Sequence, residues 1–479
     1  MANKKDELIK ILGPENVIDD PETLESYSRD QSFVSPRKPR LVINPNNVDE
    51  VQEIVKWANQ TSTPLVPVSS GPPHFRGDTV PTVPEAVIVD LSGMKRITSI
   101  DRRNRFVMIE PGVTFGQLQG ELAKEGLRLS APLLPRSSKS VITSLLEREP
   151  TLIPRYRYSM LEPLRALTLV WGNGERFNTG SAGSSVVPPL VTYGPGQADW
   201  GRFVAAAQGS MGIVTSASLR CKLLPQLRKI FFVTSEKLDD LLGFAYKVLR
   251  FRYGDEFLFL NNSNLASILG EGPDQIRALR EKLPSWVLIL GVAGRSRLPK
   301  KRVEFQQKDI TDIAQQFSLQ LLSSIPGASD GQVLEAMLSP SGEPYWKLGC
   351  KGGCQDIFFL TTLNMTLEFV RAMYSVAEAL GYSTSDIGIY IQPEHMGVCC
   401  HCEFSLPYNP SNPEEVAKVQ GLFTEASEKL MKQGAFFSRP YGIWADMVYK
   451  RDAQAAVVLR KVRGIFDPNG VMNPGKLCF

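Results

Sequence analysis

A strand, loop and strand unit within residues 64–91 places the strongest constraint on the fold. The runs PLVPV (64–68) and AVIVDL (86–91) are typical of strands, and the loop GPPHFRGDTV (71–80) joins them. Apolar residues at helical spacing over 48–60 predict a helix before the first strand. Such a loop can hold a diphosphate with backbone N–H groups, although its two prolines have none to offer.

The length of 479 residues exceeds what one compact core usually holds, so we expect two or three domains. The net charge of +4 is small and evenly spread, which argues against nucleic acid or an acidic membrane surface as a partner. No apolar run approaches the roughly 20 residues of a membrane span, and MANKKDELIKILG lacks a signal-peptide core. The predicted location is therefore the cytoplasm.

The pattern of expected strands and helices changes near residue 226. Before it, strand-like runs dominate, and Asn173-Gly174 predicts a hairpin turn. After it, strands alternate with amphipathic helices, for example SWVLILGVAG (285–294) and FVRAMYSVAEALG (369–381). This mixture predicts an α+β fold with a second α+β domain lying over the first.

Seven cysteines are present, and five of them fall within residues 350–402. An odd number scattered over a long chain disfavours a disulfide scaffold. The spacings C-x3-C and CC-H-C differ from familiar zinc and iron–sulfur patterns. We therefore expect buried, reduced thiols and no metal site.

Three separated segments carry a family resemblance: EPGVTFGQLQGELAKEGL (110–127), GSMGIVTSASL (209–219) and FDPNGVMNPGK (466–476). In this order they resemble the FAD-linked oxidase family of the vanillyl-alcohol oxidase and p-cresol methylhydroxylase fold, which also includes the flavoprotein subunits of glycolate oxidase and D-lactate dehydrogenase. A single glycine motif would be weak, but three in family order are specific.

The resemblance implies an α+β architecture in three parts. A two-subdomain FAD-binding domain of the p-cresol methylhydroxylase type is expected over residues 1–225, and a cap or substrate domain over 226–455. Residues 456–479 are expected to return to the FAD-binding domain.

The family pattern also implies which residues bind FAD. The loop from Pro67 to Pro81 matches the one that wraps the flavin diphosphate, and SVITSLLER (140–148) keeps part of a second cofactor segment. Asp356 stands where some relatives carry a flavin-linking histidine, so FAD is expected without a covalent bond. The predicted cofactor-binding residues are Ser69, Ser70, Gly71, His74, Arg76, Gly77, Pro135, Ser138, Val141, Ser144, Arg148, Gly209, Gly212, Ile213, Val214, Asn473 and Lys476.

Carried over residue by residue, the family's substrate site falls on Arg76, Arg157 and Arg439. Three guanidinium groups in one pocket would select an anion. His401 matches a position where relatives place an active-site histidine; it suits a general base, or a hydrogen-bonded structural residue. The tyrosines expected to line the pocket are Tyr156, Tyr158 and Tyr441.

The leading functional hypothesis is an FAD-dependent dehydrogenase that oxidises an anionic alcohol, either a 2-hydroxy acid or a carboxylate-bearing aromatic alcohol, by hydride transfer to flavin N5. Electrons would pass to an electron-transfer flavoprotein, an iron–sulfur subunit or a cytochrome subunit, and a homo-oligomer is expected. One alternative is an oxidoreductase acting on phenolic alcohols or alkylphenols. The other is a flavin-poor, non-catalytic subunit of a redox complex, because the prolines and missing glycines weaken the cofactor pattern.

Overall fold

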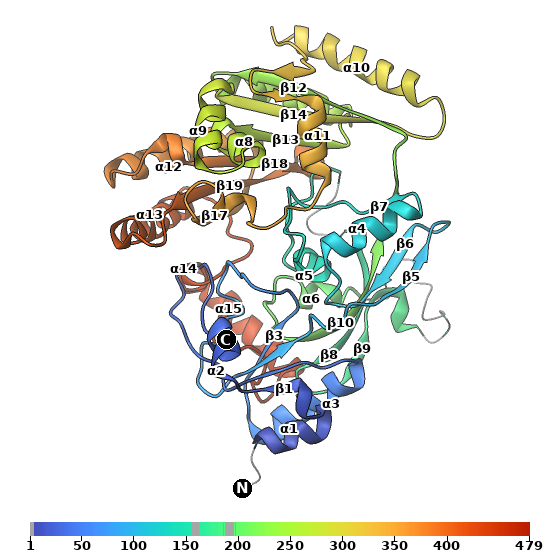
Figure 1. Ribbon diagram of the computed structural model, residues 1–479, viewed down its shortest axis with the longest axis vertical. Helices are drawn as coiled ribbons and strands as arrows, with labels where there is room; N and C mark the ends of the chain where they lie inside the picture. The colour runs from blue at the N-terminus through green and yellow to red at the C-terminus, as the bar shows by residue number, and fades with distance from the viewer. Residues whose placement is uncertain (1–3, 156–161, 185, 187–195, 197) are drawn as a thin grey trace.

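The computed structural model describes residues 4–155, 162–184, 186, 196 and 198–479. Figure 1 shows a lower body, which contains both ends of the chain, and an upper body built around one large sheet. The lower body contains two sheets, of four and five strands. The upper sheet has six strands.

The four-stranded sheet has the order β1-β2-β4-β3. Strands β2, β4 and β3 are parallel, and β1 is antiparallel to β2. Apolar side chains of helix α3 pack on this sheet, which explains the helical spacing in the sequence. The elements are α1 (Lys4–Leu12), β1 (Val17–Ile18), α2 (Pro21–Ser26), β2 (Leu41–Ile43), α3 (Val48–Thr61), β3 (Leu65–Val68) and β4 (Val87–Asp90).

The five-stranded sheet is antiparallel, with the order β5-β6-β10-β8-β9. Helix α4 packs its apolar face on it, and a short pair, β7 with β11, leads toward the upper body. The elements are β5 (Ile97–Asp101), β6 (Phe106–Ile109), α4 (Phe115–Lys124), β7 (Leu127–Arg128), α5 (Val141–Leu146), β8 (Leu164–Trp171), β9 (Arg176–Asn178), α6 (Gly201–Val204), β10 (Gly212–Arg220) and β11 (Lys222–Leu223).

The upper body, here called the cap, is an antiparallel sheet of order β12-β14-β13-β18-β19-β17. Helices α7, α10, α12 and α13 cover one face and α8, α9 and α11 the other, so both faces of the central strands are buried. Its strands are β12 (Leu227–Ser235), β13 (Glu256–Asn261), β14 (Trp286–Gly294), β17 (Gly353–Thr361), β18 (Gly388–Glu394) and β19 (Cys399–Tyr408), with a small pair β15 (Ser324–Ile325) and β16 (Ala328–Ser329). Its helices are α7 (Leu238–Arg250), α8 (Asn262–Leu269), α9 (Pro273–Lys282), α10 (Pro299–Gln315), α11 (Asp330–Leu338), α12 (Thr366–Ala379) and α13 (Pro413–Lys432).

After the cap, the chain returns to the lower body through α14 (Ile443–Arg451) and α15 (Ala453–Phe466), as Figure 1 shows. The segment after α15 then lies beside β3. The amide of Leu65 donates to Val471 O over 2.8 Å, and the amide of Asn473 donates to Leu65 O over 2.8 Å. The last residues thus extend the edge of the first sheet.

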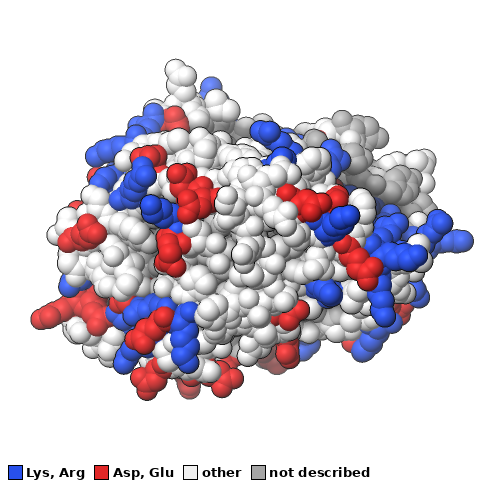
Figure 2. All heavy atoms as spheres, turned by 90° about the horizontal axis from the view of Figure 1, so that it is seen from above, with Lys and Arg blue, Asp and Glu red and all other residues white. Residues whose placement is uncertain are grey.

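The sequence-based elements agree well with this fold. The predicted helix at 48–60, strand at 64–68 and hairpin around Asn173-Gly174 correspond to α3, β3 and the β8–β9 pair, and the α+β class is confirmed. Among the described residues no helix has the length and apolar character that crossing a bilayer demands. Figure 2 shows basic and acidic side chains interspersed over the face seen from above.

Candidate active site

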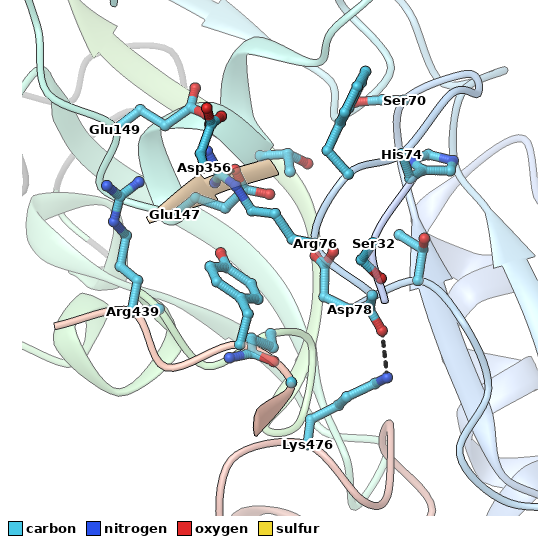
Figure 3. A pocket seen from close by; sticks show the side chains of 18 of the residues that line it. Ser32, Ser70, His74, Arg76, Asp78, Glu147, Glu149, Asp356, Arg439 and Lys476 are labelled. Carbon is cyan, nitrogen blue, oxygen red and sulfur yellow. Dashed lines mark hydrogen bonds and ion pairs between the residues drawn. The ribbon is translucent and has the colours of Figure 1, made fainter. Parts of the chain in front are cut away.

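A cavity of about 570 Å³ lies where loops of the lower body face strands β17 and β19 of the cap. This volume is within the range typical of small-molecule and cofactor sites. Figure 3 shows charged side chains from both bodies pointing into it. The lower body contributes the loop after β3, the segment before and after α5, and the turn at 206–214.

The loop after β3 is held in place by α5. Ser140 caps α5 by accepting from the amide of Thr143, and the amide of Ser140 donates to Ser70 Oγ over 2.9 Å. Ser69 and Thr143 also share a hydrogen bond between their hydroxyl groups. The helix start therefore fixes the first residues of the loop.

Further along this loop, several backbone donors are free of protein partners. The amides of Gly71, His74, Phe75 and Arg76 form no hydrogen bond with any other described residue. His74, Phe75 and Arg76 line the cavity, and free amides in such a place suit an anionic group such as a diphosphate. The residues present thus fit the phosphate part of FAD, even though Pro72 and Pro73 contribute no N–H.

Four charged side chains form a closed network in the cavity wall. Arg76 donates to Glu147 over 2.6 Å and to Glu149 over 2.7 Å, and Lys139 bonds both of these carboxylates over 2.8 Å. Burial alone would raise the pKa of Glu149, but Lys139 and Arg76 hold it well below its usual value. Figure 3 shows Arg76 directed toward Glu147 rather than into open space. Arg76 is therefore committed to two carboxylates and is not a free anion-binding group.

Arg439 is a cavity arginine with spare hydrogen-bonding capacity. Its side chain is 3% exposed, and its guanidinium carbon lies 4.1 Å from the centroid of the Phe358 ring. Nη2 lies 3.4 Å from His401 Nδ1, whereas Nη1 is buried with no hydrogen-bond partner among the described residues. A buried, unsatisfied cationic donor is costly unless a ligand satisfies it.

His401 lies behind this arginine, on β19. It is 1% exposed and does not line the cavity. Arginine only donates, so His401 Nδ1 accepts; the ring proton is then on Nε2, which lies 3.2 Å from Glu403 Oε2. Burial lowers the pKa of His401 to about 4, so the ring is neutral at neutral pH. The geometry favours a residue that orients Arg439 over a general base.

The carboxylate of Glu403 is shared with a buried lysine. Lys347 Nζ lies 2.6 Å from Glu403 and 2.7 Å from Asp356, and Asp356 also accepts from Ser405 over 2.8 Å. Arg439, His401, Glu403 and Lys347 thus form one hydrogen-bonded chain along the cap side of the cavity.

The C-terminal segment closes the opposite side. Lys476 Nζ donates to the carbonyl groups of Gly77 and Val80 over 2.6 and 2.8 Å, and Asn473 Nδ2 donates to Asp78 O and Gln208 O over 3.0 and 2.7 Å. Lys476 therefore fastens the loop through two of its three N–H groups. Its predicted phosphate contact is not tested by these bonds.

Two predicted glycines have a clear steric reason. At Gly209 φ is +70°, and an added Cβ would lie 2.5 Å from the Pro67 side chain; at Gly212 it would lie 2.5 Å from Val170 O. Both glycines let chain segments approach closely beneath the cavity.

The structure brings most of the predicted residues to the cavity. Those that line it are Ser69, Ser70, His74, Arg76, Gly77, Pro135, Gly209, Gly212, Ile213, Val214, Arg439, Tyr441 and Lys476. Those that lie nearby without lining it are Gly71, Ser138, Val141, Ser144, Arg148, His401 and Asn473. Arg157, Tyr156 and Tyr158 fall outside the described residues.

Sequence reasoning assigned no role to several charged residues of this site, namely Lys139, Arg136, Glu147, Glu149, Lys347 and Glu403. For Lys139, Glu147 and Glu149, the pattern of basic and acidic residues in KSVITSLLERE (139–149) could have indicated an ion-pair network. All seven cysteines are free thiols, and no group of three His, Cys, Asp or Glu among the described residues is arranged to hold a metal.

Comparisons with known proteins agree with this geometry. Residues 39–180 match the family model of an FAD binding domain. The flavoprotein subunit of 4-cresol dehydrogenase from Pseudomonas putida is 22% identical, over 97% of this chain and 93% of its own length. Glycolate oxidase subunit GlcD from Bacillus subtilis is 23% identical, over 99% of this chain and 96% of its own length.

The crystal structure of p-cresol methylhydroxylase with substrate bound superimposes with a TM-score of 0.82 at 18% identity, covering 99% of this chain and 96% of that one. The whole length of the chain is thus accounted for by one fold. The chain therefore contains an FAD binding domain at residues 39–180 and has, over its whole length, the fold of p-cresol methylhydroxylase.

Proposed function

We propose that this chain is an FAD-dependent dehydrogenase that oxidises a small substrate with an anionic oxygen, and that Arg439 binds that oxygen. The first candidate is a carboxylate-bearing alcohol, a 2-hydroxy acid or an aromatic hydroxy acid. When bound, FAD would supply the acceptor for a hydride from the substrate carbon, and the hydroxyl proton would leave to solvent water. Electrons then pass to a separate acceptor protein.

The single observation that carries this proposal is the unpartnered Nη1 of Arg439. A guanidinium stays charged at any working pH, so this buried donor favours a negatively charged oxygen over a neutral one. The Phe358 ring beneath the guanidinium fixes its plane, and Tyr441 lies on the same wall.

The residues behind Arg439 support a fixed rather than a mobile anion site. Neutral His401 accepts from Nη2 and donates to Glu403, which Lys347 holds in turn. Each bond restricts the rotation of the next side chain, so the guanidinium reaches the cavity already oriented. Orientation of this kind reduces the entropy cost of binding substrate.

An anaerobic spectral titration tests the proposal. The purified protein is expected to be yellow, and glycolate, lactate or mandelate is expected to bleach the flavin band. Methyl lactate, which has no carboxylate charge, is the matched control and is expected to be far weaker. Equal bleaching by lactate and its methyl ester would show that no anion is recognised. Protein that takes up no FAD would favour the non-catalytic subunit instead.

A second candidate is the oxidation of an alkylphenol. The cavity wall contains the rings of Phe358, Tyr390, Tyr441 and Trp444, which suit an aromatic substrate, and Arg439 would then hold a phenolate. The similarity to 4-cresol dehydrogenase and to p-cresol methylhydroxylase also favours this candidate. Flavin bleaching by 4-cresol or 4-ethylphenol, with none by hydroxy acids, would favour this candidate.

A further inference from the structure

Arg136 is a buried arginine with no carboxylate of the described residues at ion-pair distance, although Glu343, Glu149 and Glu147 act on it from farther away. It is 5% exposed, lines the cavity, and takes part in none of the ion pairs of the described residues. Burial lowers its pKa from the ordinary arginine value. Arg76, in the same cavity, contrasts with it because two glutamates satisfy its charge. A buried charge without a counter-ion is costly, so the site at Arg136 is incomplete without an anion.

The guanidinium of Arg136 is fixed against the proline-containing loop. Its Nη1 lies 3.5 Å from Gly71 O, and its carbon lies 5.3 Å from the centroid of the Phe75 ring. Its backbone neighbours are anchored to the cap, because Ser137 N donates to Ser341 O and Ser341 N donates to Pro135 O, each over 2.8 Å. Arg136 therefore presents its charge at a defined place beside residues 71–75.

The same loop holds further unsatisfied groups. The amides of Gly71, His74, Phe75 and Arg76 have no partner among the described residues. The ring atom Nε2 of His74 is buried and also unpartnered. Arg136 and the free amides of His74, Phe75 and Arg76 thus share one stretch of cavity wall, and a multiply charged anion would satisfy them together. In the tautomer with its proton on Nε2, His74 would add a further donor.

We propose that Arg136 binds the diphosphate of FAD, and that its charge takes the place of the two amide donors that Pro72 and Pro73 remove from the loop. The inference rests on the FAD requirement of the proposed function, but not on the identity of the substrate. Arg136 and the free amides together form the diphosphate site of this chain, and the diphosphate is the counter-ion that the buried guanidinium lacks.

The test compares wild type with Arg136→Met, which keeps the stem over Phe75 but removes the charge, and Arg136→Lys, which keeps the charge. Affinities for FAD and riboflavin are measured by flavin fluorescence after flavin extraction. Arg136→Met is expected to weaken FAD about 10- to 100-fold, the usual effect of losing charge-assisted hydrogen bonds, with riboflavin unchanged. Arg136→Lys is expected to recover most of the loss. Arg280→Met is the matched control, because Arg280 pairs with Asp386 over 2.8 Å in the cap.

A flavin-free measurement supplies a second readout. Inorganic pyrophosphate is expected to raise the melting temperature of wild type and of Arg280→Met, but not that of Arg136→Met. Unchanged FAD affinity in Arg136→Met, or equal weakening of FAD and riboflavin, would overturn the inference. Wild type that binds FAD but is reduced by no anionic substrate would overturn the proposed function and leave the inference intact. Wild type that binds no FAD would overturn both.

Discussion

Lys347 is the residue whose removal should most disturb the cap side of the cavity. Its side chain is 8% exposed and its Nζ bonds two carboxylates, Asp356 at 2.7 Å and Glu403 at 2.6 Å. The substitution Lys347→Met would leave both acids buried without their shared cation. Removing one partner of a buried ion pair typically costs about 3–5 kcal/mol. Because one lysine serves two acids here, we expect a cost of about 4–5 kcal/mol at pH 8.

The stability lost in Lys347→Met should increase as the pH rises. Burial raises the pKa of Asp356, whereas in Glu403 the effect of burial is outweighed by Lys347 and by the His401 N–H, so the pKa falls. A lowered carboxyl pKa stabilises the fold above the unfolded value near 4.3, and this is lost as pH falls. Without Lys347 both carboxyl pKa values rise, so the penalty grows between about pH 5 and pH 8.

Urea unfolding of wild type and Lys347→Met at saturating FAD, at pH 5 and at pH 8, measures the difference in their free energies of unfolding. The matched control is the triple variant Lys347→Met, Asp356→Asn, Glu403→Gln, in which none of these three charges remains; it should recover most of the lost stability. A loss below about 1 kcal/mol, a loss equal at both pH values, or a triple variant as unstable as the single one would refute the reasoning.

Three further outcomes follow from the site. Arg439→Met should raise KM for an anionic substrate about 10- to 100-fold, because it removes one charged donor, while the Kd for FAD stays constant. Steady-state kinetics measure KM and a flavin titration measures the Kd for FAD; an unchanged KM would contradict the role of Arg439. Burial raises the pKa of Glu394 to about 7, so wild type should lose stability as pH rises from about 4.5 through 7. Glu394→Gln should remove this loss, of the order of 3 kcal/mol, and a pH profile of stability parallel to that of wild type would contradict it. Gly209→Ala should cost about 1–3 kcal/mol in thermal unfolding, because φ is +70° and the new Cβ would meet Pro67; an unchanged Tm would show that the turn can shift.

Local sequence patterns predicted the elements better than their contacts. The apolar spacing in 48–60 predicts a helix, and the structure has one at Val48–Thr61. The prediction is possible because the apolar face of a helix is formed by residues three or four positions apart in the sequence. The charge network was not predictable in this way, since Arg76 meets Glu147 and Glu149 across more than 70 residues. The sequence therefore predicted Arg76 as an anion-binding group, although the fold gives it two carboxylates.

His401 and Arg439 illustrate the same limit. Both were identified as site residues by resemblance, but 38 positions separate them and their mutual bond depends on how β19 faces the segment after α13. A neutral ring oriented between an arginine and a glutamate cannot be distinguished from a general base by residue type alone.

The return of the chain to the edge of β3 affects how the protein matures. Asn473 and Lys476 bond carbonyl groups of Gly77, Asp78, Val80 and Gln208, so these carbonyl groups acquire these partners only from residues synthesised up to 399 positions later. During translation the nucleotide-binding half lacks this brace. Capture of the cofactor should therefore be a late event that follows synthesis of residues 467–476, and shortening the chain before Asn473 should affect flavin retention before it affects the distant cap sheet.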